Sequence, residues 1–385
     1  MKRWIGLVLA LGMVLGLFLG AVPSAKAAPL EVGGKSALLM ELSTGKILYE
    51  KNAHEPLPPA SVTKVMTMLL IMEAIDNGQI GWNDPVTASE AAAAKGGSQI
   101  YLKVGETMTV TDMVKSIAVS SANDCACAMA EHIAGSEAAF VDKMNQRAKE
   151  LGMNDTHFVN CTGLDDDPNA KEHLTSAYDI ALMSRELMLH HPDIRKFTTI
   201  WMDTVRNGEF GLSNTNKLVR FYPGATGLKT GFTSGAGYCL SATAQRDGME
   251  LAAVVMGCAT SAERFAACKG MLDYGFATYA VVNPSLEEAP AVPVVLGKEE
   301  AVNAVLGEFD PVLIEKAQKG SISTQIELEK EIAAPVSKGQ RLGTFTIKCG
   351  DQVLAQIPLI AQKAVKKKTF GDLFMEILKL AAMAK

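Results

Sequence analysis

Two hairpin patterns lie far apart in this sequence, and together they constrain the fold more than any other feature. Residues 36–42 and 47–51 are apolar, partly β-branched runs joined by a Ser-Thr-Gly-Lys turn. Residues 238–244 and 249–257 flank a second turn that ends in Asp247-Gly248, a strong turn signal. Strands early, helical spacing in the middle and strands late predict one antiparallel sheet that closes only when the two ends of this region meet.

The segment between the hairpins is predicted to be helical. Apolar residues recur at helix spacing over residues 62–72, so a buried central helix should begin at Ala60 or Ser61. Further helices are expected at residues 111–118, 124–133, 136–151 and about 175–189. In the last of these, Ser176 and Asp179 have the spacing of a capping box.

The C-terminal part of the chain has a different pattern. Short alternating runs occupy residues 323–328, 341–347 and 352–357. They predict a small all-β domain over residues 283–365. Residues 366–385 begin with three lysines and continue with apolar residues spaced i, i+3, i+4, i+7, i+8 and i+11 from Phe370. We expect an amphipathic helix that anchors the protein at a membrane surface, and the alternative is a helix docked on its own domain.

The N-terminal residues have the order of a secretory signal peptide. Lys2 and Arg3 precede an uncharged apolar run over residues 4–22, which is followed by the small-residue site Ala25-Lys26-Ala27. We expect residues 1–27 to be removed and the rest to be exported, to the outer face of the cytoplasmic membrane or the cell-wall space. An uncleaved membrane anchor is the alternative.

Charge and cysteine content exclude several kinds of partner. The chain has 37 Lys+Arg against 42 Asp+Glu, a net charge of -5, which argues against a nucleic-acid partner. The seven cysteines are odd in number and form no Cys-X-X-Cys or Cys/His cluster. We interpret them as small buried apolar residues, and we expect neither a metal nor an organic cofactor.

One pair of residues at the start of the predicted central helix points to chemistry. Ser61-Val62-Thr63-Lys64 places a hydroxyl and an amine on one helix face within mutual reach, the geometry of a serine activated by a lysine. The same pattern occurs at Ser43-Thr44-Gly45-Lys46, but that copy lies in a hairpin turn. A turn offers no helix N-terminus whose N–H groups could stabilise an oxyanion, so we predict Ser61 as the nucleophile.

Two more motifs follow along the chain. Ser121-Ala122-Asn123 lies in a polar break between two predicted helices, where the structural interpretation is a helix cap. Lys229-Thr230-Gly231 lies on a predicted strand beside the second hairpin, and alone it is a strand end. The three motifs in this order match the signature set of penicillin-binding proteins and serine β-lactamases.

The sequence resembles the low-molecular-mass penicillin-binding proteins that are serine-type D-Ala-D-Ala carboxypeptidases. Further blocks similar to that family's are Pro59-Ala60-Ser61, Gly163-Leu164-Asp165, Thr175-Ser176-Ala177, Lys229-Thr230-Gly231-Phe232-Thr233 and Asp273-Tyr274-Gly275-Phe276. The resemblance implies an α+β fold. Its parts are a β-lactamase/transpeptidase-like domain at residues 28–282, with helices on both faces of an antiparallel sheet plus a helical subdomain, then the all-β domain and the amphipathic helix.

The resemblance also implies a mechanism. Ser61 attacks the carbonyl of the penultimate D-Ala of a peptidoglycan stem peptide, Lys64 takes its proton, and an acyl-enzyme forms as the terminal D-Ala leaves. Ser121 passes the proton to the leaving amine. The N–H groups of Ser61 and Phe232 form the oxyanion hole. The implied substrate-binding residues are Asn123, Lys229, Thr230, Gly231, Phe232 and Arg264.

Within that implied site, each binding residue has a role. Asn123 holds the substrate amide and Lys64, while Lys229 and Thr230 bind the substrate carboxylate. Arg264 resembles a further carboxylate contact, with a solvated surface residue as the alternative. A lysine is a base at neutral pH only if its pKa falls, and we attribute the fall at Lys64 to the second cation, Lys229.

Other activities on the same residues remain open from the sequence. A β-lactamase needs a carboxylate that drives water onto the acyl-enzyme, and Glu150 offers a similar spacing to Asn154. We assign Glu150 a surface role, because Gly152 ends its predicted helix, and we therefore expect penicillin and other β-lactams to act as covalent inhibitors. A D,D-endopeptidase and a non-catalytic penicillin-binding sensor are the remaining alternatives.

Several conspicuous polar residues have simpler interpretations. Asp165-Asp166-Asp167 is interpreted as a solvated loop rather than a cation site. His173, just before a helix cap, is interpreted as a packing or capping residue rather than a ligand. His190-His191 lies at a predicted helix end, where histidine is favourable to the helix dipole.

Overall fold

The structure is a computed structural model of the chain, and it describes residues 30–166, 169–286 and 288–383. The predicted signal peptide, residues 1–27, lies outside the described residues, as does Asp167 of the acidic loop. Export is therefore an expectation that the fold does not address.

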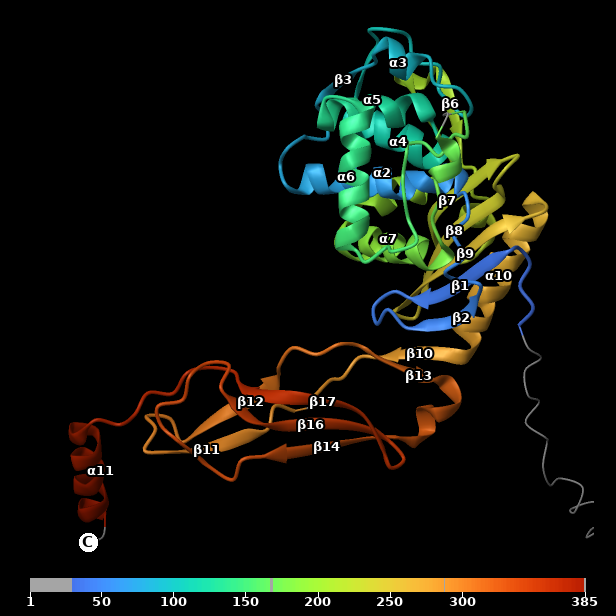
Figure 1. Cartoon of the computed structure of the whole chain (residues 1–385). Coiled ribbons are helices and arrows are strands. Elements are labelled where there is room, and N and C mark those ends of the chain that lie inside the picture. The colour runs from blue at the N-terminus through green and yellow to red at the C-terminus, as the bar shows by residue number, and fades with distance from the viewer. Residues whose placement is uncertain (1–29, 167–168, 287, 384–385) are drawn as a thin grey trace, which may run out of the picture. The chain divides into compact units, whose positions relative to one another are not determined.

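A five-stranded antiparallel sheet forms the centre of the first domain (Figure 1). Its strands, in the spatial order β2-β1-β9-β8-β7, are β2 (Ile47–Lys51), β1 (Ser36–Glu41), β9 (Met249–Cys258), β8 (Gly237–Arg246) and β7 (Ala225–Thr233). The two hairpins join because β1 pairs with β9, with Ser36 opposite Met256. This confirms the predicted closure, and it leaves β7 as an edge strand.

Helices cover both faces of this sheet, because the side chains of β1 are apolar on both sides. Leu38 and Met40 point into the core that contains the central helix α2 (Lys64–Asp76) and α7 (Ala177–His190). Leu39 points the other way, where a Cβ added at Gly275 of α10 (Ser261–Thr278) would lie 3.1 Å from it. Successive residues of β1 thus pack alternately against the helices on the two faces of the sheet (Figure 1).

The central helix is preceded by one turn of 3-10 helix, η1 (Ala60–Thr63). Most residues of α2 are buried, as its sequence predicts, since apolar residues lie on most of its sides. The start of α7 is capped as predicted, because Ser176 Oγ accepts the Asp179 N–H at 3.1 Å.

A helical subdomain fills the middle of the chain, at the top of Figure 1. Its longer helices are α4 (Val110–Ser120), α5 (Asn123–Ala134) and α6 (Glu137–Glu150). Short elements that the sequence patterns did not predict are α3 (Glu90–Ala93), α8 (Arg195–Thr198), α9 (Leu218–Phe221), η2 (Ala170–Glu172), η3 (Pro192–Ile194), η4 (Arg206–Gly208) and the strand pairs β3 (Pro85–Thr87) with β4 (Thr107–Thr109) and β5 (Met202–Val205) with β6 (Phe210–Ser213). They are three or four residues long, too short to show a period.

The C-terminal part is an all-β domain with its own core, which includes Val292, Phe345 and Leu359. Its six-stranded sheet has the order β14 (Ile322–Leu328), β16 (Arg341–Cys349), β17 (Gln352–Ala361), β12 (Ala301–Leu306), β11 (Ala291–Val295) and β15 (Ile332–Ala333). A second pair joins β10 (Tyr279–Val282) to β13 (Val312–Glu315), and η5 (Lys316–Ser321) follows β13. The domain boundary at residue 283 stays a prediction.

The last described element is the helix α11 (Phe370–Met383), which has no buried residue. Among the described helices, none is both long and apolar enough to pass through a bilayer. The α+β fold, the all-β domain and the terminal helix are confirmed.

Candidate active site

Ser61 and Lys64 meet at the junction of η1 and α2. Lys64 Nζ lies 3.0 Å from Ser61 Oγ and donates a second hydrogen bond to the Thr162 carbonyl oxygen at 2.8 Å. The Lys64 side chain is completely buried, at 0% exposure. A long amine side chain is thus held rigidly against a hydroxyl, as the Ser-X-X-Lys spacing predicts.

Burial gives Lys64 the properties of a base. Desolvation lowers its pKa from 10.5 to about 7, although Cys161 and Asp124 act in the opposite direction. The fall itself was expected, but its predicted cause was wrong: burial, not repulsion from Lys229, lowers the pKa of Lys64. The repulsion between the two amines contributes instead to the lowered pKa of Lys229, after burial, together with Arg264.

Ser121 and Asn123 lie between α4 and α5 with polar atoms that the protein leaves unpaired. Ser121 is 3% exposed and adopts a left-handed conformation (φ +64°) at the end of α4. Within the described residues, neither Ser121 Oγ nor Asn123 Oδ1 has a hydrogen-bond partner. Ser121 is the C-cap residue of α4, with its backbone N–H bonded to the carbonyl oxygens of Ile117 and Ser116, so the helix-cap interpretation holds for its backbone, but neither side chain caps α5. Buried unpaired polar atoms require an explanation, and two of them here belong to one motif.

Asn123 is also anchored from behind. Its Nδ2 donates to the Gly96 carbonyl oxygen at 2.7 Å, and its backbone N–H donates to the Ser98 carbonyl oxygen at 2.7 Å. These bonds fix the side chain, and the predicted contact of Oδ1 with a substrate N–H stays a prediction. The bonds of Lys64 Nζ go to Ser61 and Thr162, and the predicted role of Asn123 toward Lys64 stays a prediction.

The edge strand β7 carries Lys229-Thr230-Gly231 against the turn at residues 59–61, which we call the Ser61 turn. A Cβ added at Gly231 would lie 2.5 Å from the Pro59 carbonyl oxygen and 3.1 Å from the Ser61 nitrogen, so the strand backbone approaches this turn as closely as only glycine permits. Lys229, buried at 1% exposure, donates from Nζ to the Thr230 carbonyl oxygen at 2.8 Å.

Two side chains of β7, one in the Lys-Thr-Gly motif and one directly after it, make further contacts. Thr230 Oγ1 bonds Thr215 Oγ1 at 2.7 Å, a contact that sequence reasoning missed. Phe232 is 53% exposed and lies on Tyr238, with 4.3 Å between ring centroids. An exposed aromatic ring next to the motif is available to a bound ligand.

Arg264 lies on α10, behind β7. It is 8% exposed, and its Nη1 donates to the carbonyl oxygens of Gly231 at 2.9 Å and Cys239 at 3.3 Å. The alternative of a solvated surface residue is therefore wrong. Burial lowers the pKa of Arg264, and its Nε has no partner within the described part of the chain. Its contact with a substrate carboxylate remains a prediction.

The loop around Thr162 supplies the contact that sequence reasoning missed. Its backbone carbonyl accepts a hydrogen bond from Lys64, and the next residue, Gly163, has φ +80° and packs on the Ser61 turn. A Cβ at Gly163 would lie 1.9 Å from the Ala60 carbonyl oxygen. The Gly163-Leu164-Asp165 block had marked this loop as similar to the family. The contact itself is made by a main-chain carbonyl of Thr162, which any residue type would offer, so no sequence motif could predict it.

Glu150 does not resemble a deacylating carboxylate. It ends α6, its side chain is 49% exposed, and it accepts hydrogen bonds from Gln146 and Arg147 of its own helix. The predicted surface role is confirmed.

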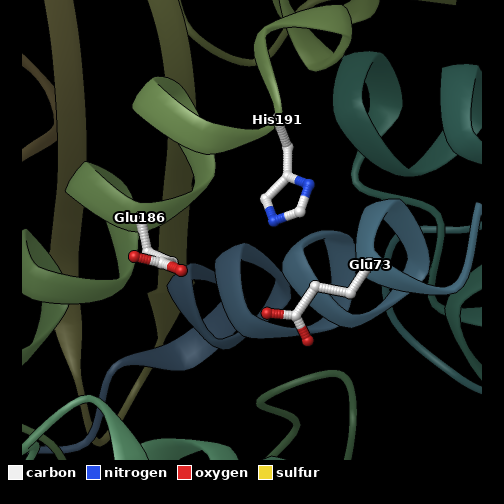
Figure 2. Close-up of side chains that lie close together, drawn as sticks. All are labelled: Glu73, Glu186 and His191. Carbon is white, nitrogen blue, oxygen red and sulfur yellow. The ribbon is translucent and has the colours of Figure 1, made fainter. Parts of the chain in front are cut away.

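One group of side chains in the described ranges has the spacing of a metal site. The ligand atoms of Glu73, Glu186 and His191 lie within 4.8 Å of one another, between α2 and the end of α7 (Figure 2). Arg147, however, donates to Glu73 Oε1 at 2.7 Å and to Glu186 Oε1 at 2.6 Å. His190 Nδ1 lies 2.9 Å from Glu186 Oε2. Protein groups thus occupy three of the four carboxylate oxygens, and we interpret the cluster as an ion-pair network that ties α2, α6 and α7 together.

Comparison with known proteins agrees with this geometry. The family model for D-alanyl-D-alanine carboxypeptidase matches residues 23–260, and the model for the penicillin-binding protein 5 C-terminal domain matches residues 287–367. D-alanyl-D-alanine carboxypeptidase DacF of Bacillus subtilis is 46% identical over 342 residues, 87% of each chain.

Solved structures agree as well. Penicillin-binding protein 5 from Haemophilus influenzae has a TM-score of 0.72 at 30% identity, covering 89% of this chain and 100% of that one. Penicillin-binding protein D2 from Listeria monocytogenes, in an ampicillin-bound form, has a TM-score of 0.59 at 32% identity and covers 65% of this chain and 100% of that one.

A sheet with helices on both faces and a serine bonded to a buried lysine define the class of the serine penicillin-binding proteins. Within that class, the chain belongs to the D-alanyl-D-alanine carboxypeptidase family. The expected family, fold and serine carboxypeptidase activity are confirmed.

Proposed function

We propose that Ser61 is the nucleophile with which this enzyme removes the terminal D-Ala from peptidoglycan stem peptides. The observation that carries the proposal is the 3.0 Å contact between Ser61 Oγ and the buried Lys64 Nζ. A neutral amine keeps a lone pair that can accept the Ser61 proton along this contact, and a pKa of about 7 makes that form available near neutral pH.

The reaction then runs in two halves. Ser61 Oγ bonds to the carbonyl carbon of the penultimate D-Ala, and its proton goes to Lys64. The C–N bond breaks, and the amine of the terminal D-Ala takes a proton by way of Ser121, a role supported by the lack of a partner for its hydroxyl among the described residues. Water then hydrolyses the ester, which frees the shortened peptide and restores Ser61.

The edge strand β7 supports substrate binding. An extended peptide can pair with a free strand edge, and the close approach of Gly231 keeps the Phe232 N–H near that of Ser61 for the oxyanion. Thr230 and Lys229 would bind the substrate carboxylate. Lys229 has a strongly lowered pKa in the free protein, and an arriving carboxylate would raise it again.

The same serine would be acylated by β-lactams, as the ampicillin-bound form of the Listeria relative suggests. A β-lactam ring opens without losing a separate leaving group, and slow hydrolysis of the resulting ester would leave the enzyme inhibited. The surface position of Glu150 supports slow hydrolysis, because that carboxylate cannot drive water onto the ester.

The helix α11 supports anchoring of an exported enzyme at a membrane surface. Its large apolar side chains are open to solvent: Phe370 is 85% exposed, Ile377 65% and Leu380 65%. Residues 366–368 are three lysines, which favour anionic lipid headgroups. We place the enzyme at the outer face of the cytoplasmic membrane, in the cell-wall space.

The test is the pair of substitutions Ser61→Ala and Ser43→Ala. Ser43 belongs to the second Ser-X-X-Lys copy, and its hydroxyl bonds Glu41 at 2.8 Å. Ser61→Ala should abolish both D-Ala release from a pentapeptide and covalent labelling by fluorescent penicillin, whereas Ser43→Ala should retain both. Labelling of the Ser61→Ala protein would refute the nucleophile, and a labelled wild type that releases no D-Ala would identify a sensor.

A further inference from the structure

His173 stands at the centre of a buried chain of hydrogen bonds. It is 4% exposed, and its Nδ1 accepts the Val159 backbone N–H at 3.1 Å. Its Nε2 lies 2.7 Å from Thr63 Oγ1, and that hydroxyl donates to the Ala60 carbonyl oxygen at 2.8 Å. A backbone donor at one end and a backbone acceptor at the other fix the direction of the chain, so the proton of the neutral ring is on Nε2.

The two ends of this hydrogen-bond chain lie beside the two residues proposed to carry out acylation, Ser61 and Lys64. Ala60 adopts φ +49°, a left-handed conformation that a non-glycine residue avoids, and it directly precedes Ser61. Val159 begins the loop whose Thr162 carbonyl accepts the Lys64 hydrogen bond at 2.8 Å. The imidazole therefore connects the turn that presents the nucleophile with the loop that orients its base.

We propose that His173 is a positioning residue for acylation, which through Thr63 sets the strained turn at Ala60 against the loop at Thr162. The inference rests on the proposed role of Ser61 and Lys64. Histidine suits the position because one rigid ring accepts at one nitrogen and donates at the other, and its edge contact with Phe158, 5.6 Å between centroids, fixes the ring plane.

The test compares His173→Gln with His157→Gln. His157 pairs with Leu174, the neighbour of His173, in an isolated bridge, but its side chain is exposed. His173→Gln should lower the rate of acylation by fluorescent penicillin and kcat for D-Ala release at least about tenfold, with KM nearly unchanged, because a small misplacement of reacting groups costs rate rather than binding. His157→Gln should match the wild type.

Thr63 variants separate positioning from folding. Thr63→Val removes the hydroxyl at nearly equal volume and should slow acylation as His173→Gln does. Thr63→Ser keeps the hydroxyl and should be acylated at the wild-type rate. The double variant, His173→Gln with Thr63→Val, should be acylated no more slowly than the slower of the two single variants, because both substitutions break the same chain of hydrogen bonds. Wild-type acylation rates in folded His173→Gln, or additive losses in the double variant, would overturn the inference. A wild type that neither labels nor releases D-Ala would instead overturn the proposed function.

Discussion

At the scale of single residues, the site contains two buried lysines whose pKa values lie below the ordinary value. Lys64 and Lys229 are both buried, and burial is the largest cause of the lowered pKa of each. An ammonium group cannot accept the serine proton, so in the proposed mechanism the removal of Lys64 from water is what activates Ser61. The motif spacing predicted the contact, but the buried environment creates the base.

The pH dependence of acylation tests this cause. The rate constant for labelling by penicillin should rise as pH passes through about 7 and level off above it, because Lys64 loses its proton in that range. The free energy of unfolding should depend on the same lysine. The pKa of Lys64 is 10.5 in the unfolded chain, so between pH about 7 and 10.5 the unfolded chain binds one more proton than the folded chain, and the free energy of unfolding rises with pH. A labelling rate that rises only near pH 10 would contradict a buried base.

At the scale of elements, the contact between β7 and the Ser61 turn decides whether the motifs form one site. Their residues are separated by most of the domain in sequence, and Gly231 is the point at which the two backbones meet. Its place in the Lys-Thr-Gly triplet thus has a steric reason, since any side chain there would collide with Pro59.

The substitution Gly231→Ala tests that contact. We expect acylation by penicillin to fall by about two orders of magnitude, because the added Cβ must push the strand or the Ser61 turn aside. The matched control is Gly211→Ala on β6, where a Cβ would meet no atom within 4 Å. Acylation should be unchanged in the control. Equal activity of the two variants would show that the turn and β7 need not touch.

At the scale of the whole molecule, the terminal helix pairs with its own domain at Lys298 and Asp372, 3.1 Å apart, and no residue of its described apolar stripe is buried. Its large side chains remain exposed, which favours the membrane interpretation over a helix docked on its own domain. The proposed catalytic residues all lie far earlier in the sequence, so anchoring and catalysis should be separable.

Deletion of residues 366–385 should therefore release the protein from membranes without changing acylation by penicillin. Phe374→Glu, on the apolar face of α11, should weaken binding to anionic vesicles, whereas Glu376→Gln should not. Cell fractionation and vesicle sedimentation measure these effects. Membrane association that survives the deletion would remove the anchoring role.

Much of this protein follows from the sequence by itself, because the deciding information is local. Hairpin turns, helix spacing and the Ser176 cap depend on residues within a few positions of one another, and each is found where predicted. The Ser61–Lys64 pair is local too, since one helical turn joins its members. The resemblance carried by three short motifs was enough to predict the family and the activity.

Only the tertiary structure decided what surrounds those motifs. The Thr162 carbonyl reaches Lys64 across 98 residues of sequence, and His173 reaches Thr63 across 110. Distant segments that pack together also decide the direction in which Arg264 points and the burial that lowers the pKa of Lys64. They likewise leave Ser121 Oγ without a partner among the described residues. No periodicity or spacing encodes such contacts, because their partners are backbone atoms and neighbours that folding alone brings close.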